Sequence, residues 1–180
     1  MKTSGFTIIE ILVGMAIFLV VAGASAGLLV SGLSSQQFSL SNQTVSTQTS
    51  FLGEYMTRVI RQASKELGAP PTCVTTGTGE NYMVTNSDST LTFVDKDGAC
   101  HVFSKNGGKI QETVGGGATQ DLTAADVTVN VLFFEIAGES QTDNIQPRVK
   151  LYIELEGEGD TPPKIPFQTT VSQRRYDVEN

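Results

Sequence analysis

Residues 6–30 read FTIIEILVGMAIFLVVAGASAGLLV, and their only ionisable side chain is that of Glu10. About 20 apolar residues are enough for a helix that crosses a bilayer. The stretch therefore predicts a membrane-spanning helix near the N-terminus of this 180-residue chain. A carboxylate near the end of such a helix is costly unless it has a partner and a role, so the presence of Glu10 needs an explanation.

A removable signal peptide is a second interpretation of the same stretch. Signal peptides combine a basic start, an apolar core of about 7–15 residues and a small-residue cleavage site. The segment 22–26, Ala-Gly-Ala-Ser-Ala, resembles such a site. The apolar core is longer than a signal peptide needs, however, and a discarded segment would leave Glu10 unexplained.

The motif G-F-T-I-I-E at residues 5–10 resembles the processing site of type IV pilins and type II secretion pseudopilins. It follows a short basic leader, as it does in that family. The resemblance implies that a prepilin peptidase cuts after Gly5 and that the new N-terminal residue, Phe6, is methylated. An unprocessed membrane anchor is the alternative.

The resemblance also implies that Glu10 and Thr7 are assembly residues. In a filament the Glu10 carboxylate would face the N-terminal amine of Phe6 on a neighbouring subunit, because a buried charge is tolerable only when it is paired. The carboxylate also suits the positive end of its own helix, which begins only a few residues earlier. Either effect would serve assembly without being needed for folding of the outer domain.

Partners and location follow from the same resemblance. The implied partners are other pilin or pseudopilin subunits, the prepilin peptidase and an inner-membrane assembly platform with its ATPase. The precursor would cross the membrane once, with a cytoplasmic N-terminus and an extracytoplasmic domain, and would end in a periplasmic or extracellular filament. The size of the outer domain is closer to minor pilins and J-type pseudopilins than to a small major pilin.

The apolar stretch departs from many pilins because it contains no helix-kinking proline. Glycines occur along it and just beyond it instead, at Gly14, Gly23, Gly27 and Gly32. The spacing of Gly23 and Gly27 permits close helix contacts in lipid, although it is also ordinary for a membrane helix.

Helical periodicity continues beyond the membrane segment. Apolar residues recur at steps of three and four and predict one buried helical face, formed by Leu52, Tyr55, Met56, Val59, Ile60, Ala63 and Leu67. Gly68 and the prolines that follow it predict the end of this helix. We therefore expect the helix to continue over residues 31–67.

The rest of the sequence predicts strands, at 82–85, 90–94, 100–104, 109–114, 127–136, 148–156 and 164–172. Asp-Gly and Asn-Gly pairs between them predict hairpin turns. The expected fold is α+β, with a long helix that covers the apolar face of an antiparallel sheet. Its parts are a leader at 1–5, a membrane or filament-core helix at 6–30, the continuation at 31–67 and a β-rich domain at 68–180.

Cys73 and Cys100 are the only cysteines, and both lie beyond the apolar stretch. A disulfide is plausible if this part of the chain is outside the cytoplasm, and two free buried thiols are the alternative. A disulfide would tie the end of the helix to the sheet. Two cysteines and His101, the only histidine, do not complete a zinc site.

No catalytic motif is present in the sequence, so we expect neither enzymatic activity nor a cofactor. His101 is predicted to be a half-buried strand residue. The run from Asp95 to Gly98 resembles the start of a calcium loop, but the acidic ligand expected near its end is missing, so we interpret it as a turn and predict no metal site.

The remaining charges give weaker indications. The acidic run Glu154, Glu156, Glu158 and Asp160 either protects a strand edge or forms a cation or partner site. A net charge of −7 without a Lys/Arg cluster argues against nucleic-acid binding.

The sequence thus favours a structural subunit of a type IV pilus or of a related type II secretion or competence filament. A monomeric, membrane-anchored extracytoplasmic binding protein or adhesin is the alternative, and a secreted enzyme with a long signal peptide is a third interpretation. The first two differ at Glu10, which a filament subunit needs and a plain anchor does not.

Overall fold

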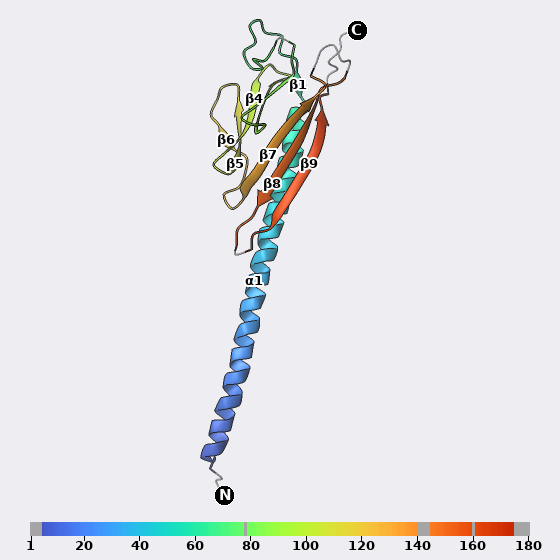
Figure 1. Ribbon diagram of the computed structural model, residues 1–180. Coiled ribbons are helices and arrows are strands. Elements are labelled where there is room, and N and C mark those ends of the chain that lie inside the picture. The colour runs from blue at the N-terminus through green and yellow to red at the C-terminus, as the bar shows by residue number, and fades with distance from the viewer. Residues whose placement is uncertain (1–4, 78, 140–144, 160, 175–180) are drawn as a thin grey trace. The chain divides into compact units, whose positions relative to one another are not determined.

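The computed structural model describes residues 5–77, 79–139, 145–159 and 161–174 (Figure 1). Most of the expected leader, at 1–4, and the C-terminal tail from 175 lie outside the described residues. The chain divides into two compact units, Met1–Leu40 and Ser41–Asn180. One long helix and antiparallel sheets follow one another along the chain, which confirms the α+β prediction.

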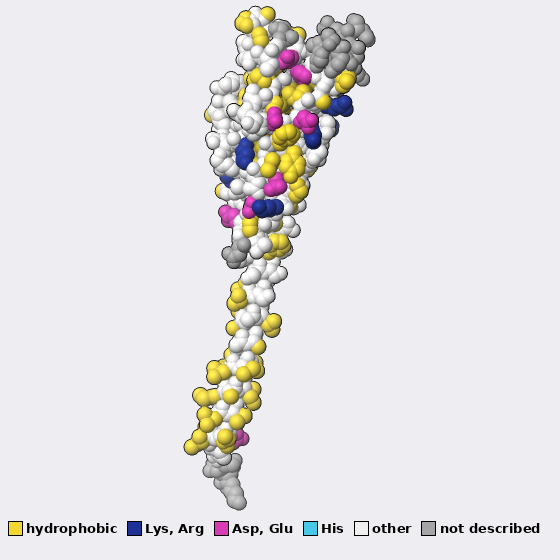
Figure 2. All heavy atoms as spheres, in the orientation of Figure 1, with side chains coloured by type: hydrophobic (Ala, Val, Ile, Leu, Met, Phe, Trp, Pro, Cys, Tyr) yellow, Lys and Arg dark blue, Asp and Glu magenta, His cyan; other side chains and the backbone are white. Residues whose placement is uncertain are grey.

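Helix α1 (Ile8–Ile60) begins in the first unit and ends in the second. In the first unit every large apolar side chain from Phe6 to Leu40 is exposed. Hydrophobic side chains accordingly lie on the surface of this part of the helix, most densely toward its N-terminal end (Figure 2). Residues 5–40, the described part of the first unit, therefore form no core of their own and expose their side chains to the surrounding medium.

In the second unit one face of α1 is buried, as the periodicity predicted. Val45, Leu52, Met56 and Ile60 are fully buried. The helix ends at Ile60.

The prediction that the helix continues to Leu67 is wrong. Ala63 and Ser64 form the short strand β1 (Ala63–Ser64), which pairs with Asp95 and Val94. Ala63 is still buried, so its place in the apolar pattern fits a strand as well as a helix. Leu67, by contrast, is 75% exposed and belongs to no core face.

The first sheet holds six antiparallel strands, in the order β1-β3-β4-β5-β6, with β2 also paired to β3. The strands that follow β1 are β2 (Tyr82–Thr85), β3 (Thr90–Asp95), β4 (Cys100–Asn106), β5 (Lys109–Val114) and β6 (Gln120–Asp121). The hairpin from β3 to β4 and the turn from β4 to β5 lie where the sequence predicted them. The two-residue strands β1 and β6 were not predicted.

The other three strands form a separate sheet, in the order β7-β8-β9. They are β7 (Thr128–Ala137), β8 (Arg148–Glu156) and β9 (Lys164–Ser172). The alternation predicted for β8 is confirmed, because Val149, Leu151, Ile153 and Leu155 are all fully buried. The register of β7 against β8 shifts between Val129 and Val131, so Asn130 is the extra residue of a β-bulge.

Both sheets and the C-terminal part of α1 share one core. Phe93 and Phe103 from the first sheet and Phe134 from the second are fully buried in it, together with the helix residues. Backbone hydrogen bonds from β7 join the sheets, from Val129 N to Gly108 O at 2.8 Å and from Phe134 N to Asp88 O at 2.8 Å.

Two glycines allow close contacts within this unit. A Cβ at Gly53 on α1 would lie 2.6 Å from Cζ of Phe167 on β9. A Cβ at Gly157, just after β8, would lie 2.4 Å from Oγ of Ser41. The helix can approach the β7-β8-β9 sheet this closely because both positions lack a side chain.

Candidate functional site

The N-terminal motif forms a helix cap. Thr7 lies just before α1, and its Oγ1 accepts a hydrogen bond from Glu10 N at 3.3 Å. In return, the Glu10 carboxylate accepts one from Thr7 N at 3.4 Å. This reciprocal pattern is a capping box, which satisfies backbone donors that the first helical turn leaves unpaired. This cap was not predicted from the sequence, although the T-x-x-E spacing is its usual indicator.

The predicted processing residues are accessible beside this cap. Gly5 is exposed and lies outside the helix, and the Phe6 side chain is 79% exposed. Gly5, Phe6, Thr7 and Glu10 therefore lie together at the start of α1. The bond that a peptidase would cut precedes the helix, where the backbone can enter an active site without unwinding a turn.

The helix that follows the cap suits a lipid environment. It is the one helix among the described residues that is long and apolar enough to cross a membrane, judged by length and composition. The hydroxyls of Ser25 and Ser34 donate to the carbonyl oxygens of Val21 and Val30, at 2.8 and 3.1 Å. The two serine hydroxyls are thus hydrogen-bonded within the helix itself, as an apolar environment requires.

Cys73 and Cys100 form a disulfide, with their Cα atoms 5.6 Å apart. It joins the loop after β1 to the first residue of β4. Because α1 ends at Ile60, the bond ties this loop, rather than the helix, to the sheet.

A buried carboxylate, Glu66, organises the same loop. Its oxygens accept hydrogen bonds from Gly68 N at 2.9 Å and from Cys73 N at 3.1 Å. The bond from Gly68, with those from Cys73 and its neighbours, holds the pKa of Glu66 below its usual value despite the opposing effect of burial.

His101 is 9% exposed and forms part of a polar cluster in the first sheet. Its ring nitrogens contact Glu112 Oε1 at 3.0 Å and Asp95 Oδ2 at 3.2 Å. The ring also stacks on Phe93, with centroids 5.3 Å apart. His101 is thus more buried than predicted, and both of its nitrogens are engaged, so it is placed to stabilise the sheet.

Tyr55 connects this cluster to α1, because its hydroxyl donates to Glu112 Oε2 at 2.6 Å. Burial and this hydrogen bond raise the pKa of Tyr55 to about 12. Burial opposes the charged form of Asp95, but hydrogen bonds from Ala99 N, Asp97 N and His101 together hold its pKa below the usual value.

The calcium-like segment is a turn. Asp95 Oδ1 accepts hydrogen bonds from Asp97 N and Ala99 N, both at 2.8 Å, and Gly98 adopts a positive φ of 85°. Within the described parts of the chain, no group of three or more His, Cys, Asp or Glu side chains could hold a metal ion.

The acidic run lies at the junction of β8 and β9. Glu156 pairs with Lys164 at 3.2 Å and accepts a hydrogen bond from the bulge residue Asn130 at 2.6 Å. Glu154 also accepts from Asn130, at 3.2 Å, whereas Glu158 is exposed. Asp160, the last member of the run, lies outside the described residues.

Comparison with known proteins agrees with the geometry of the N-terminus. A model of the prokaryotic N-terminal methylation motif matches residues 1–26. The match supports the family of type IV pilins and type II secretion pseudopilins that the motif at 5–10 resembles, and it indicates a membrane-anchored precursor. No curated protein and no solved structure matches the chain.

Proposed function

We propose that the chain is a structural subunit, of the minor pilin or J-type pseudopilin kind, of a type IV pilus or a related secretion or competence filament. The observation that carries the proposal is the methylation motif matched over residues 1–26, which includes the start of a helix whose large apolar side chains are all exposed up to Leu40. Such a surface is unstable in water and requires lipid or other helices around it. A filament core formed from copies of the same helix meets that requirement.

In this proposal a prepilin peptidase cuts after Gly5, and Phe6 becomes the methylated N-terminus. The Glu10 carboxylate then pairs with the amine of Phe6 on a neighbouring subunit and favours one axial register, because an unpaired carboxylate in the core would be costly. Within its own helix this carboxylate has the Thr7 amide as a partner, at the long distance of 3.4 Å. A charged partner would bind it more strongly than this neutral donor.

The proposed partners are other pilin or pseudopilin subunits, the peptidase and an inner-membrane assembly platform. Before assembly, the precursor would span the inner membrane with its N-terminus in the cytoplasm. Unit Ser41–Asn180, which we call the outer unit, would lie on the other side. The disulfide is consistent with that location, because disulfides persist in oxidising compartments.

The first test is the intact mass and N-terminal residue of the protein from its native membranes. We expect a chain that begins at methylated Phe6 and keeps the whole apolar stretch. A chain that begins after Ala24 or Ala26 would indicate a removed signal peptide, and a retained Met1 would indicate a simple anchor; either result would contradict the proposal.

The second test separates the two roles of Glu10. Glu10→Val should abolish assembly, whereas a monomeric anchor or adhesin would tolerate the change. Glu10→Gln is the matched control, because glutamine can still accept the Thr7 hydrogen bond but carries no charge. If charge pairing drives assembly, both variants fail while the outer unit stays folded. Normal assembly of Glu10→Gln would show that capping alone is needed.

A further inference from the structure

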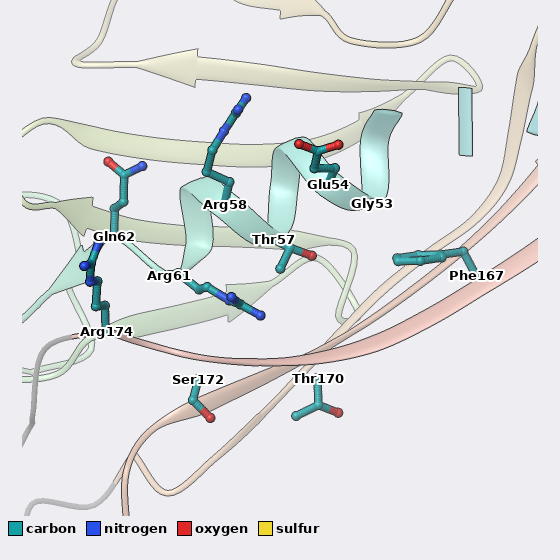
Figure 3. A pocket seen from close by; sticks show the side chains of 10 residues that line it. All are labelled: Gly53, Glu54, Thr57, Arg58, Arg61, Gln62, Phe167, Thr170, Ser172 and Arg174. Atoms are coloured by element: carbon teal, nitrogen blue, oxygen red, sulfur yellow. The ribbon is translucent and has the colours of Figure 1, made fainter. Parts of the chain in front are cut away.

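The second unit carries a groove of about 860 Å³ between the C-terminal part of α1 and β9 (Figure 3). Arg58, Arg61 and Arg174 line it, which are three of the chain's five arginines, together with one carboxylate, Glu54. None of these three arginines forms an ion pair with another described residue. The groove is therefore locally positive on a chain whose net charge is −7.

Two of the arginines are placed to receive an anionic partner. Thr57 on α1 and Arg61, just after the helix, point toward β9, and Arg174 lies beside Gln62 at the end of the groove (Figure 3). Arg58 points away from β9, and its guanidinium lies 5.8 Å from the ring centroid of Tyr55. The unsatisfied positive charge beside β9 is thus that of Arg61 and Arg174.

The acidic junction of β8 and β9 lies at the other end of the same strand. β9 begins at Lys164, which pairs with Glu156, and ends at Ser172, two positions before Arg174. The junction is held in place by hydrogen bonds from Gly157 N to Pro163 O at 3.0 Å and from Ser41 Oγ to Glu158 O at 2.8 Å. Because these bonds hold the backbone of the junction, the exposed carboxylate of Glu158 reaches solvent at a defined position.

We propose that Glu158 of one copy of this chain docks in the arginine groove of a second copy, where its carboxylate pairs with Arg61 and Arg174. The proposal rests on the proposed function, which supplies the neighbouring copy. Copies with a net charge of −7 repel one another in general, so the positive groove is the place where an acidic junction can approach.

This contact is heterologous, because the two surfaces lie at opposite ends of β9. A head-to-tail contact leaves one free groove and one free acidic junction on every pair, so it can be repeated without closing. The docking would therefore extend a filament at the level of the outer units, in addition to whatever the N-terminal helices contribute.

Chemical cross-linking tests the contact directly in the full chain. Arg61→Lys keeps the positive charge and supplies an amine that a carbodiimide couples to a carboxylate, with loss of water and formation of an amide. In mixed isotope-labelled and unlabelled copies in native membranes, we expect a peptide that joins the introduced amine of one copy to Glu158 of another. Arg148→Lys, on the exposed face of β8, is the control and should give no such peptide. No cross-link at position 61, or equal cross-linking in the control, would overturn the docking.

Charge reversal tests its contribution to assembly. Arg61→Glu and Glu158→Arg should each lower the assembled fraction about tenfold, as expected for loss of a close charge pair at an interface. The double variant should recover most of the loss, and a double variant no better than the singles would contradict the docking. If wild-type filaments form and depend on Glu10 but the double variant does not recover, only the docking fails. If the wild type forms no filament, the proposed function itself fails.

Discussion

Whether Gly53→Ala on α1 lowers or raises the free energy of unfolding should depend on a single neighbouring side chain, that of Phe167. An alanine Cβ at this position would lie 2.6, 2.9 and 3.0 Å from three ring atoms of Phe167. Carbon atoms do not approach so closely, so the ring must move outward on β9. Overpacking of this kind costs about 1–3 kcal/mol.

A second, opposite effect acts at the same site. Glycine in a helix interior is about 1 kcal/mol less favourable than alanine, so Gly53→Ala gains that amount when nothing obstructs the new methyl group. In the wild-type background the two effects predict a net destabilisation of about 0–2 kcal/mol. In a Phe167→Ala background the clash is absent, and Gly53→Ala should stabilise the unit by about 1 kcal/mol.

The measurement is a double-mutant cycle on the full chain in detergent, unfolded by guanidinium and followed by near-UV circular dichroism. The coupling free energy between the two positions should be about 1–3 kcal/mol. Gly32→Ala is the control, because a methyl group at this position would meet no atom within 4 Å beyond its chain neighbours and the nearby helix backbone, so unit Ser41–Asn180 should unfold unchanged. The same effect of Gly53→Ala in both backgrounds, or a stabilised single variant, would refute the argument.

Three further predictions concern the outer unit. Cys73→Ser should destabilise it by about 2–4 kcal/mol, and an unchanged melting temperature in oxidising buffer would contradict a structural role for the disulfide. The pKa of Glu66 is lower in the folded protein than the value of 4.5 that is usual for this side chain. Between these two pKa values the unfolded chain binds more protons than the folded one. The stability that Glu66 contributes should therefore be lost as the pH falls through the folded pKa. Glu66→Gln should reduce the steepness of that acid-induced loss, and an identical melting profile against pH would count against it. Ile60→Ala should cost about 2–5 kcal/mol, whereas Leu67→Ser should change stability by less than about 0.5 kcal/mol in denaturant titrations. Equal costs at the two positions would place Leu67 in the core after all.

Much of the outer unit was predictable because apolar residues recur along its elements with one regular spacing, two residues in strands and three to four in the helix. The limits of β8 and β9 agree with the prediction, since alternating residues such as Leu151 and Ile153 face the core while their neighbours do not. The helix end was not predictable from periodicity, because Ala63 is buried in a strand at a position that also fits the helical pattern. Only the pairing of β1 with β3 distinguishes the two, and that pairing is not local.

The candidate sites also differ in whether their residues are close in the sequence, and therefore in whether the sequence could predict them. The Thr7–Glu10 cap is local in sequence, and its spacing alone could have predicted it. The arginine groove depends on Arg174 lying near the end of α1, where its backbone N–H donates to Arg61 O at 2.9 Å. Residues 61 and 174 come together only through packing of the β7-β8-β9 sheet, so no local sequence pattern predicts the cluster.

The cap at the start of α1 bears on how a subunit could leave one environment for another. Because Thr7 N already donates to the Glu10 carboxylate, the charge enters an apolar medium with a donor in place. This bond engages one carboxylate oxygen, Oε2, and Oε1 is a second acceptor. A charged donor on a neighbouring subunit can therefore bind the carboxylate without displacing the cap. The same carboxylate has a donor within its own chain before a neighbour arrives and after it leaves, which suits both the addition and the withdrawal of a subunit.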